Sequence, residues 1–173
     1  MIIGLSGKLG SGKSSVARYL SNEHGYRILS SRKLLENILK SNNETTTIEN
    51  LQNLGARLIS VIHGPGFMTL MLEGITKEDV VIDAIRQVDA IDYLRRCFPS
   101  KFKHVYVETN FDNRYFRVNN RDGKLDKAKL ELLDKAETEE ENALLKSGAD
   151  FVLENDSEIS SFYKSIENIL KKI

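Results

Sequence analysis

Cysteine is nearly absent from the sequence, because Cys97 is the only one in 173 residues. A single cysteine excludes an intrachain disulfide. It also excludes a cysteine-based metal cluster, since the three histidines are scattered and none stands at metal-ligand spacing from it. Cys97 precedes Phe98 at the end of a predicted helix, where we expect a buried structural thiol.

An excess of charge of either sign is also missing. Lys+Arg and Asp+Glu both total 25, so the formal net charge is zero. A neutral chain has no overall field to hold it on a polyanion or an anionic membrane, which argues against bulk nucleic-acid binding and leaves only local basic sites. The chain has no apolar run of membrane-spanning length and no secretion-signal pattern at its start. These absences predict a cytoplasmic protein without a membrane partner.

Short apolar runs alternate with helical patterns along the whole chain, and 40% of the residues are hydrophobic, enough for an ordinary core. The predicted strands are residues 2–5, 26–29, 80–83, 104–107 and 151–153. This order predicts right-handed crossovers and a single α/β domain over residues 1–173, with a five-stranded, mostly parallel sheet and helices on both faces. Ligands of such sheets bind at the carboxyl ends of the strands.

Helical patterns fill the long connections. Thr46 and Glu49 have the spacing of a capping box at the start of a long helix, and the stretch from His63 to Gly66 (His-Gly-Pro-Gly) should break that helix. The pattern of residues 125–146 predicts a long, highly charged helical stretch.

A glycine-rich motif follows the first predicted strand and opens an amphipathic helix. It matches the pattern G-x-x-x-x-G-K-[ST], in which backbone N–H groups and a helix N-terminus surround phosphate. We expect Lys13 to reach the β- and γ-phosphates of a nucleoside triphosphate and Ser14 to place its hydroxyl on Mg²⁺. The predicted triphosphate-binding residues are Gly7, Lys8, Leu9, Gly10, Ser11, Gly12, Lys13, Ser14 and Ser15.

Asp83 ends the most apolar of the predicted strands. A carboxylate at a strand terminus beside the phosphate loop is well placed to hold a water bound to Mg²⁺. The alternative is that Asp83 caps the helix that follows it, because Asp is also a good N-cap residue.

Arginines stand at loop and strand-end positions. A kinase that joins two phosphate-bearing substrates needs arginines on the acceptor side and over the transferring group. Arg32, Arg57 and Arg86 are candidates for acceptor binding. Arg114, Arg117 and Arg121 fall at three- and four-residue steps, so they should share one helical face, either as a catalytic lid or as a solvated basic face.

The chain resembles the adenylate-kinase-like group of P-loop nucleotide kinases, and therefore a P-loop NTPase three-layer fold with a small helical lid. Residues 3–7 and 15–17 resemble the opening of dephospho-coenzyme A kinases, and Arg117-x-x-x-Arg121-Asp-Gly looks like the lid of that family. Residues 149–155 are similar to its final strand and adenine-side loop, which implies that Asn155 contacts the nucleotide.

The middle of the chain differs from that family. Residues 80–86 are similar to an Asp-Gly-x-Arg segment of phage-type deoxynucleoside monophosphate kinases, with Ala84 in place of the glycine. Dephospho-coenzyme A kinases carry Asp-x-Asp after the second strand, where residues 29–32 here read Leu-Ser-Ser-Arg without a carboxylate. A phosphate acceptor is already anionic and needs no strong base. The missing carboxylate after the second predicted strand therefore favours a nucleoside or deoxynucleoside monophosphate kinase.

Our hypothesis is in-line transfer of the γ-phosphoryl of ATP, with Mg²⁺, to a small nucleotide substrate. The resemblance implies a helical acceptor-binding insert at about residues 31–78 and a lid at about 111–147. The alternatives are a dephospho-coenzyme A kinase-like enzyme, a kinase of nucleic-acid ends and a non-catalytic or regulatory nucleotide-binding protein. The sequence leaves the acceptor, its base and the oligomeric state open.

Overall fold

The computed structural model describes residues 1–122, 126–136 and 139–173. Within these ranges, the side chains of residues 48, 121, 122, 133, 136, 139 and 140 also lie outside the description. None of the helices in the described ranges is long and apolar enough to span a membrane.

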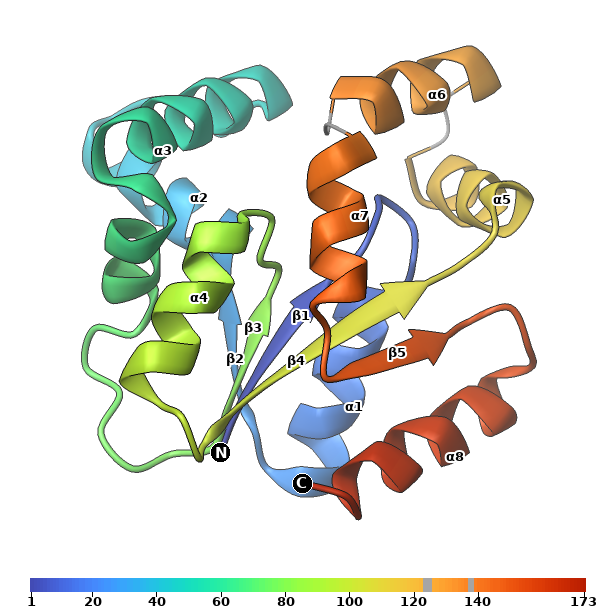
Figure 1. The fold of residues 1–173 in the computed structure, drawn as a ribbon. Coiled ribbons are helices and arrows are strands. Elements are labelled where there is room, and N and C mark those ends of the chain that lie inside the picture. Colours follow the sequence, from blue (N-terminus) through green and yellow to red (C-terminus); the bar gives the residue numbers. More distant parts are fainter. Residues whose placement is uncertain (123–125, 137–138) are drawn as a thin grey trace.

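Five strands form one sheet in the order β2-β3-β1-β4-β5, and every neighbouring pair is parallel. The strands are β1 (Ile2–Ser6), β2 (Arg27–Ser30), β3 (Val80–Asp83), β4 (Phe102–Glu108) and β5 (Phe151–Glu154). Because β1 is central, the loop that follows it emerges between the carboxyl ends of β3 and β4 (Figure 1). The predicted parallel α/β sheet is confirmed.

Eight helices are described, and they flank the sheet on both sides (Figure 1). They are α1 (Lys13–His24), α2 (Ser31–Ser41), α3 (Ile48–Met71), α4 (Val88–Cys97), α5 (Phe111–Asp122), α6 (Lys127–Ala136), α7 (Glu139–Ser147) and α8 (Ile159–Leu170). Strand residues alternate between two apolar clusters, as the two-residue period of a strand requires. Along β3, Val80 and Ile82 join the cluster under α3 and α4, whereas Val81 joins the cluster under α1 and α8.

Helix α3 differs from its prediction at its start and agrees with it in the middle. Its N-cap is Thr47, whose side chain accepts from the backbone N–H of Asn50, so the capping box predicted at Thr46 is wrong by one residue. The predicted break is present, because His63 has φ 54° and ψ −178° within the helix. Pro65 then follows in the second helical segment.

The charged stretch over residues 125–146 is helical in α6 and α7, and residues 125, 137 and 138 lie outside the description. One further expectation is wrong, because Cys97 is exposed. The buried face of α4 consists of Ala90, Ile91 and Leu94, and the helix ends at Cys97, so the next residue, Phe98, packs against the core at that end.

Candidate active site

The phosphate loop (Gly7–Ser14) joins β1 to α1 through glycines in the left-handed region. Gly7 has φ 132° and Gly12, the N-cap of α1, has φ 103°, conformations that side chains disfavour. Both glycines also lie against neighbouring groups. A Cβ on Gly7 would collide with the carbonyl oxygen of Val107, and one on Gly12 would collide with the amide of Asn155. The loop is therefore fitted tightly between β4 and the segment after β5.

Lys13, the first residue of α1, folds back over the loop. Its Nζ donates to the carbonyl oxygens of Gly7 at 2.5 Å and Lys8 at 2.9 Å. The ammonium group is thereby held at the mouth of the loop, where the N-terminal end of α1 adds its partial positive charge. This arrangement can bind an anion.

Ser14 and Asp83 meet although 69 residues separate them. The parallel register pairs Leu5 with Asp83, and the Ser14 hydroxyl donates to Asp83 Oδ2 at 2.7 Å. The N-cap of α4 is Gln87, so the alternative in which Asp83 caps the following helix is wrong. A hydroxyl and a carboxylate oxygen are ligands that suit Mg²⁺.

In the described part of the chain, no group of three or more His, Cys, Asp or Glu side chains could hold a metal ion. An ion beside Ser14 and Asp83 would therefore complete its coordination with water or with substrate phosphates, which is the usual manner for Mg²⁺.

Arg114 from α5 supports the phosphate loop from the β4 side. Its side chain forms a bidentate ion pair with Asp134 of α6, at 2.9 Å for Nη1 and 2.5 Å for Nη2. Nη1 also donates to the carbonyl oxygen of Leu9 at 3.1 Å. The residue is only 4% exposed, so this ion pair ties α5, α6 and the loop together in a buried position.

Arg117 and Asn155 form a second support. Arg117 Nη2 donates to the carbonyl oxygen of Asn155 at 2.7 Å, and Asn155 Nδ2 donates to the carbonyl oxygen of Ser11 at 2.8 Å. Arg114 and Arg117 thus share a helix and contact different parts of the same loop. The side chain of Arg121 lies outside the described residues.

The candidate acceptor residues lie on the β3 side of β1, across the sheet from Arg114 and Arg117. Arg32 is 67% exposed and pairs with Glu36 on its own helix, α2. Arg57 is exposed on α3, and Arg86 is exposed between β3 and α4. Their roles in acceptor binding stay predictions.

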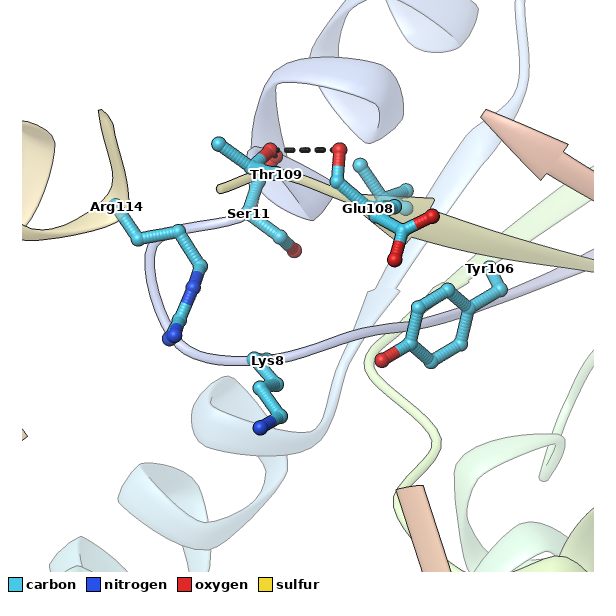
Figure 2. A pocket seen from close by; sticks show the side chains of 7 residues that line it. Lys8, Ser11, Tyr106, Glu108, Thr109 and Arg114 are labelled. Atoms are coloured by element: carbon cyan, nitrogen blue, oxygen red, sulfur yellow. Dashed lines mark hydrogen bonds between the residues drawn. The ribbon is translucent and has the colours of Figure 1, made fainter. Parts of the chain in front are cut away.

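The sequence interpretation missed four residues next to the loop. Tyr106 and Glu108 come from the end of β4, Thr109 directly follows it, and Asp134 comes from α6. Tyr106, Glu108 and Thr109 line a cavity with Lys8, Ser11, Val107 and Arg114 (Figure 2). Glu108 could have been found, because it ends β4 as Asp83 ends β3. Nothing in the sequence singles out Asp134, because it is one carboxylate among many in a highly charged stretch.

A buried polar pair lies behind this site, in the sheet. Ser6 Oγ and His104 Nε2 share a hydrogen bond of 2.6 Å between β1 and β4. His104 is 1% exposed. Burial, with a smaller contribution from the charge of Arg95, lowers the pKa of the imidazole from 6.5 to about 4. The ring is therefore neutral at physiological pH.

The family model described as "AAA domain" matches residues 3–144, which include the phosphate loop, Asp83 and α5. The chain belongs to this AAA domain family. This AAA domain protein is also 30% identical, over 181 aligned positions, to a UPF0200 protein of Sulfurisphaera tokodaii. The alignment covers 99% of this chain and 97% of that protein, so the chain belongs to the UPF0200 family as well.

Solved kinase structures share the fold of this AAA domain protein. Shikimate kinase from Bacteroides thetaiotaomicron superposes with a TM-score of 0.63 at 19% identity, covering 99% of this chain and 97% of that chain. Deoxyadenosine kinase from M. mycoides, with bound dCTP, superposes with a TM-score of 0.56 at 16% identity, covering 100% of both chains. At these identities the likeness shows the P-loop NTPase-like fold alone.

Proposed function

We propose that this protein is an ATP- and Mg²⁺-dependent phosphotransferase that transfers the γ-phosphoryl group to a nucleoside or deoxynucleoside monophosphate. The observation that carries the proposal is the convergence of Lys13, Ser14 and Asp83 at the mouth of one phosphate loop. Chemistry of this kind needs positioned cations and a magnesium ion more than it needs covalent catalysis.

In this proposal the loop binds the triphosphate. Loop N–H groups and Lys13 hold the β- and γ-phosphates, and Ser14 and Asp83 hold Mg²⁺ directly or through water. The ion offsets the negative charge that develops on the transferring group. The adenine side of the nucleotide lies toward Asn155, whose carbonyl oxygen accepts from Arg117.

The lid consists of α5, α6 and α7, within residues 111–147. Both terminal nitrogens of Arg114 are engaged by Asp134, so we assign this residue to loop support. Arg117 and Arg121 remain the candidates to close over the γ-phosphoryl group. An arginine in that position contributes about a thousandfold or more to turnover in related chemistry.

The acceptor side is formed by α2 and α3, within residues 31–78. The segment after β2 offers no carboxylate base: Ser30 caps α2 through the N–H of Lys33, and Ser31 donates to the carbonyl oxygen of Asp83 at 3.5 Å. A phosphate acceptor needs no such base. The exposed Arg32, Arg57 and Arg86 are the candidates to bind its phosphate group.

The test is ADP release from Mg·ATP across a panel of acceptors. The panel contains the ribo- and deoxyribonucleoside monophosphates, dephospho-coenzyme A, and the hydroxyl acceptors shikimate and deoxyadenosine, with the Lys13→Ala variant as the blank. We expect acceptor-dependent release with one or a few monophosphates. Release only with dephospho-coenzyme A or a hydroxyl acceptor would contradict the acceptor class, and tight ATP binding without any release would indicate a regulatory nucleotide-binding protein.

A further inference from the structure

Asp134 of α6 contacts two basic side chains beside the phosphate loop. Arg114 of α5 donates both terminal nitrogens to its carboxylate, and Lys8 Nζ of the loop lies 3.8 Å from Oδ2. The side chains of Asp134 and Arg114 are 13% and 5% exposed, so this ion pair is shielded from water. Asp134 therefore joins a helix of the proposed lid to the loop that receives the triphosphate in the proposed function.

The carbonyl oxygen of Leu9 is the point at which this ion pair acts on the loop. Arg114 Nη1 donates to that oxygen at 3.1 Å while it is also bonded to Asp134. Arg114 Nε has no hydrogen-bond partner within the described residues, so the contacts of Nη1 and Nη2 orient the guanidinium group. Asp134 thus determines where Arg114 holds the Leu9 carbonyl.

The peptide between Leu9 and Gly10 passes this contact on to a loop donor. In a planar trans peptide the C=O and the N–H point in opposite directions, so the bond to Arg114 turns the Gly10 N–H away from α5. Helix α5 also packs against Gly10, where a Cβ would meet the Arg114 carbonyl oxygen and Val118 Cγ2, both at 2.8 Å. Backbone N–H groups are the donors that surround phosphate in such loops. The ion pair therefore fixes the direction of one of these donors.

We propose that Asp134 is a positioning residue for the phosphate loop, which acts through Arg114 and couples the position of α6 to the affinity for the triphosphate. The proposal rests on the proposed function, which places the triphosphate in this loop. Such coupling is reciprocal: if the contact with α6 raises the affinity for the triphosphate, bound triphosphate stabilises α6 by the same factor. A purely electrostatic role has the opposite sign, because a carboxylate beside the loop repels phosphate.

The first test removes the ion pair without changing the net charge. Arg114→Met/Asp134→Leu replaces the pair by two apolar side chains, which leave no unpaired charge. We expect the Kd of a non-hydrolysable ATP analogue with Mg²⁺, measured calorimetrically, to rise about 10- to 100-fold, the usual cost of losing a hydrogen bond from a charged group. The analogue should still bind at one site per chain. A merely structural role would instead lower the number of competent sites and leave the Kd of the remaining sites unchanged.

A matched control removes an ion pair between the same two helices. Lys127 of α6 pairs with Asp112 of α5, and their side chains are 57% and 80% exposed. Lys127→Gln/Asp112→Asn also keeps the net charge and should leave the Kd unchanged. An equal rise of the Kd in this variant would overturn the role of Asp134, because any disturbance of α5 and α6 would then suffice.

Asp134→Asn separates position from charge. Repulsion alone predicts that this variant binds the analogue more tightly, whereas loss of the bidentate partner of Arg114 predicts weaker binding. We expect weaker binding, and we expect Asp134→Glu, which keeps the carboxylate, to lie between Asp134→Asn and the wild type. Tighter binding in Asp134→Asn would overturn the positioning role.

Hydrogen exchange measures the coupling in the reverse direction. The analogue with Mg²⁺ should slow exchange of the backbone amides of α6 in the wild type, and this protection should fall about 10- to 100-fold in Arg114→Met/Asp134→Leu. Equal protection of α6 in both proteins would overturn the coupling.

The positioning role and the proposed function fail separately. An unchanged Kd in Arg114→Met/Asp134→Leu, in a protein that phosphorylates monophosphates, overturns the positioning role alone. A raised Kd in a protein that transfers no phosphoryl group to any acceptor overturns the proposed function alone. A wild-type protein that does not bind the analogue overturns both.

Discussion

Ser14 and Asp83 are joined by one hydrogen bond of 2.7 Å between the start of α1 and the end of β3. If this pair holds Mg²⁺, Asp83→Asn keeps the shape and removes the charge. We expect the Mg²⁺ concentration for half-maximal binding of a fluorescent ATP analogue to rise about 10- to 100-fold, the usual cost of losing a group that orients a metal ligand.

Asp92→Asn, on the exposed side of α4, is the matched control and should leave the Mg²⁺ dependence unchanged. An unchanged Mg²⁺ dependence in Asp83→Asn would remove Asp83 from the metal site.

Single residues were predictable where a local pattern determines them. The spacing of the phosphate loop predicted Lys13 and Ser14, because the eight adjacent residues Gly7–Ser14 suffice to define that turn. The Arg114–Asp134 pair was not predictable, because it depends on how the two separate helices α5 and α6 pack against each other. The spacing placed Arg114 with Arg117 on one face, and only the structure distinguishes their partners.

At the scale of one element, helix α3 contains two glycines whose replacement by alanine should change the free energy of unfolding in opposite directions. Gly64 lies against α4, where a Cβ would meet Ala90 N at 2.8 Å and Ala90 Cβ at 2.9 Å. Gly55 lies within the first helical segment, and its Cβ would only contact Leu35 Cδ1 at 3.4 Å. Gly64→Ala should lower the free energy of unfolding by about 1–3 kcal/mol through overpacking. Gly55→Ala should raise it by about 0.5–1 kcal/mol through helix propensity.

Urea unfolding of both variants measures the difference. Equal effects of the two substitutions would contradict the close contact between the kink of α3 and the first turn of α4.

Helices α5 and α6 depend on the buried ion pair between Arg114 and Asp134. Arg114→Met leaves Asp134 without its bidentate partner at 13% side-chain exposure, and we expect a loss of about 3 kcal/mol in the free energy of unfolding. Adding Asp134→Leu should recover part of that loss, because an apolar pair carries no unpaired charge.

Lys127→Met, which removes one partner of the exposed pair with Asp112, is the control and should change stability little. An Arg114→Met protein as stable as the control would show that α5 and α6 are held by apolar contacts alone.

For the whole molecule, the order of elements was predictable because short continuous apolar runs mark buried strands and Gly25 marks the end of α1, where it adopts φ 72°. The predicted helix end at Cys97 is correct, but the burial of this thiol was misjudged, because the position of a residue at the end of a helix does not tell whether its side chain faces the core.

The stability of the whole chain should depend on pH through His104. The folded state holds the pKa of this imidazole at about 4 because it is buried between β1 and β4, whereas the unfolded chain has the ordinary value of 6.5. Between these values the unfolded state binds a proton that the folded state does not. The free energy of unfolding therefore falls as pH falls from 6.5 toward 4, by up to about 3 kcal/mol. This loss should be absent above pH 7.

Urea unfolding at pH 7.5, 6.5, 5.5 and 5.0 measures this dependence in the wild type, in His104→Gln and in His63→Gln. His104→Gln should start from lower stability, because the bond to Ser6 is altered, and should lose less on acidification than the wild type. His63 is exposed on α3, so His63→Gln should follow the wild-type slope. If the wild type and His104→Gln lose stability in parallel, the acid sensitivity belongs to the surface carboxylates and His104 is not the group that links protonation to folding.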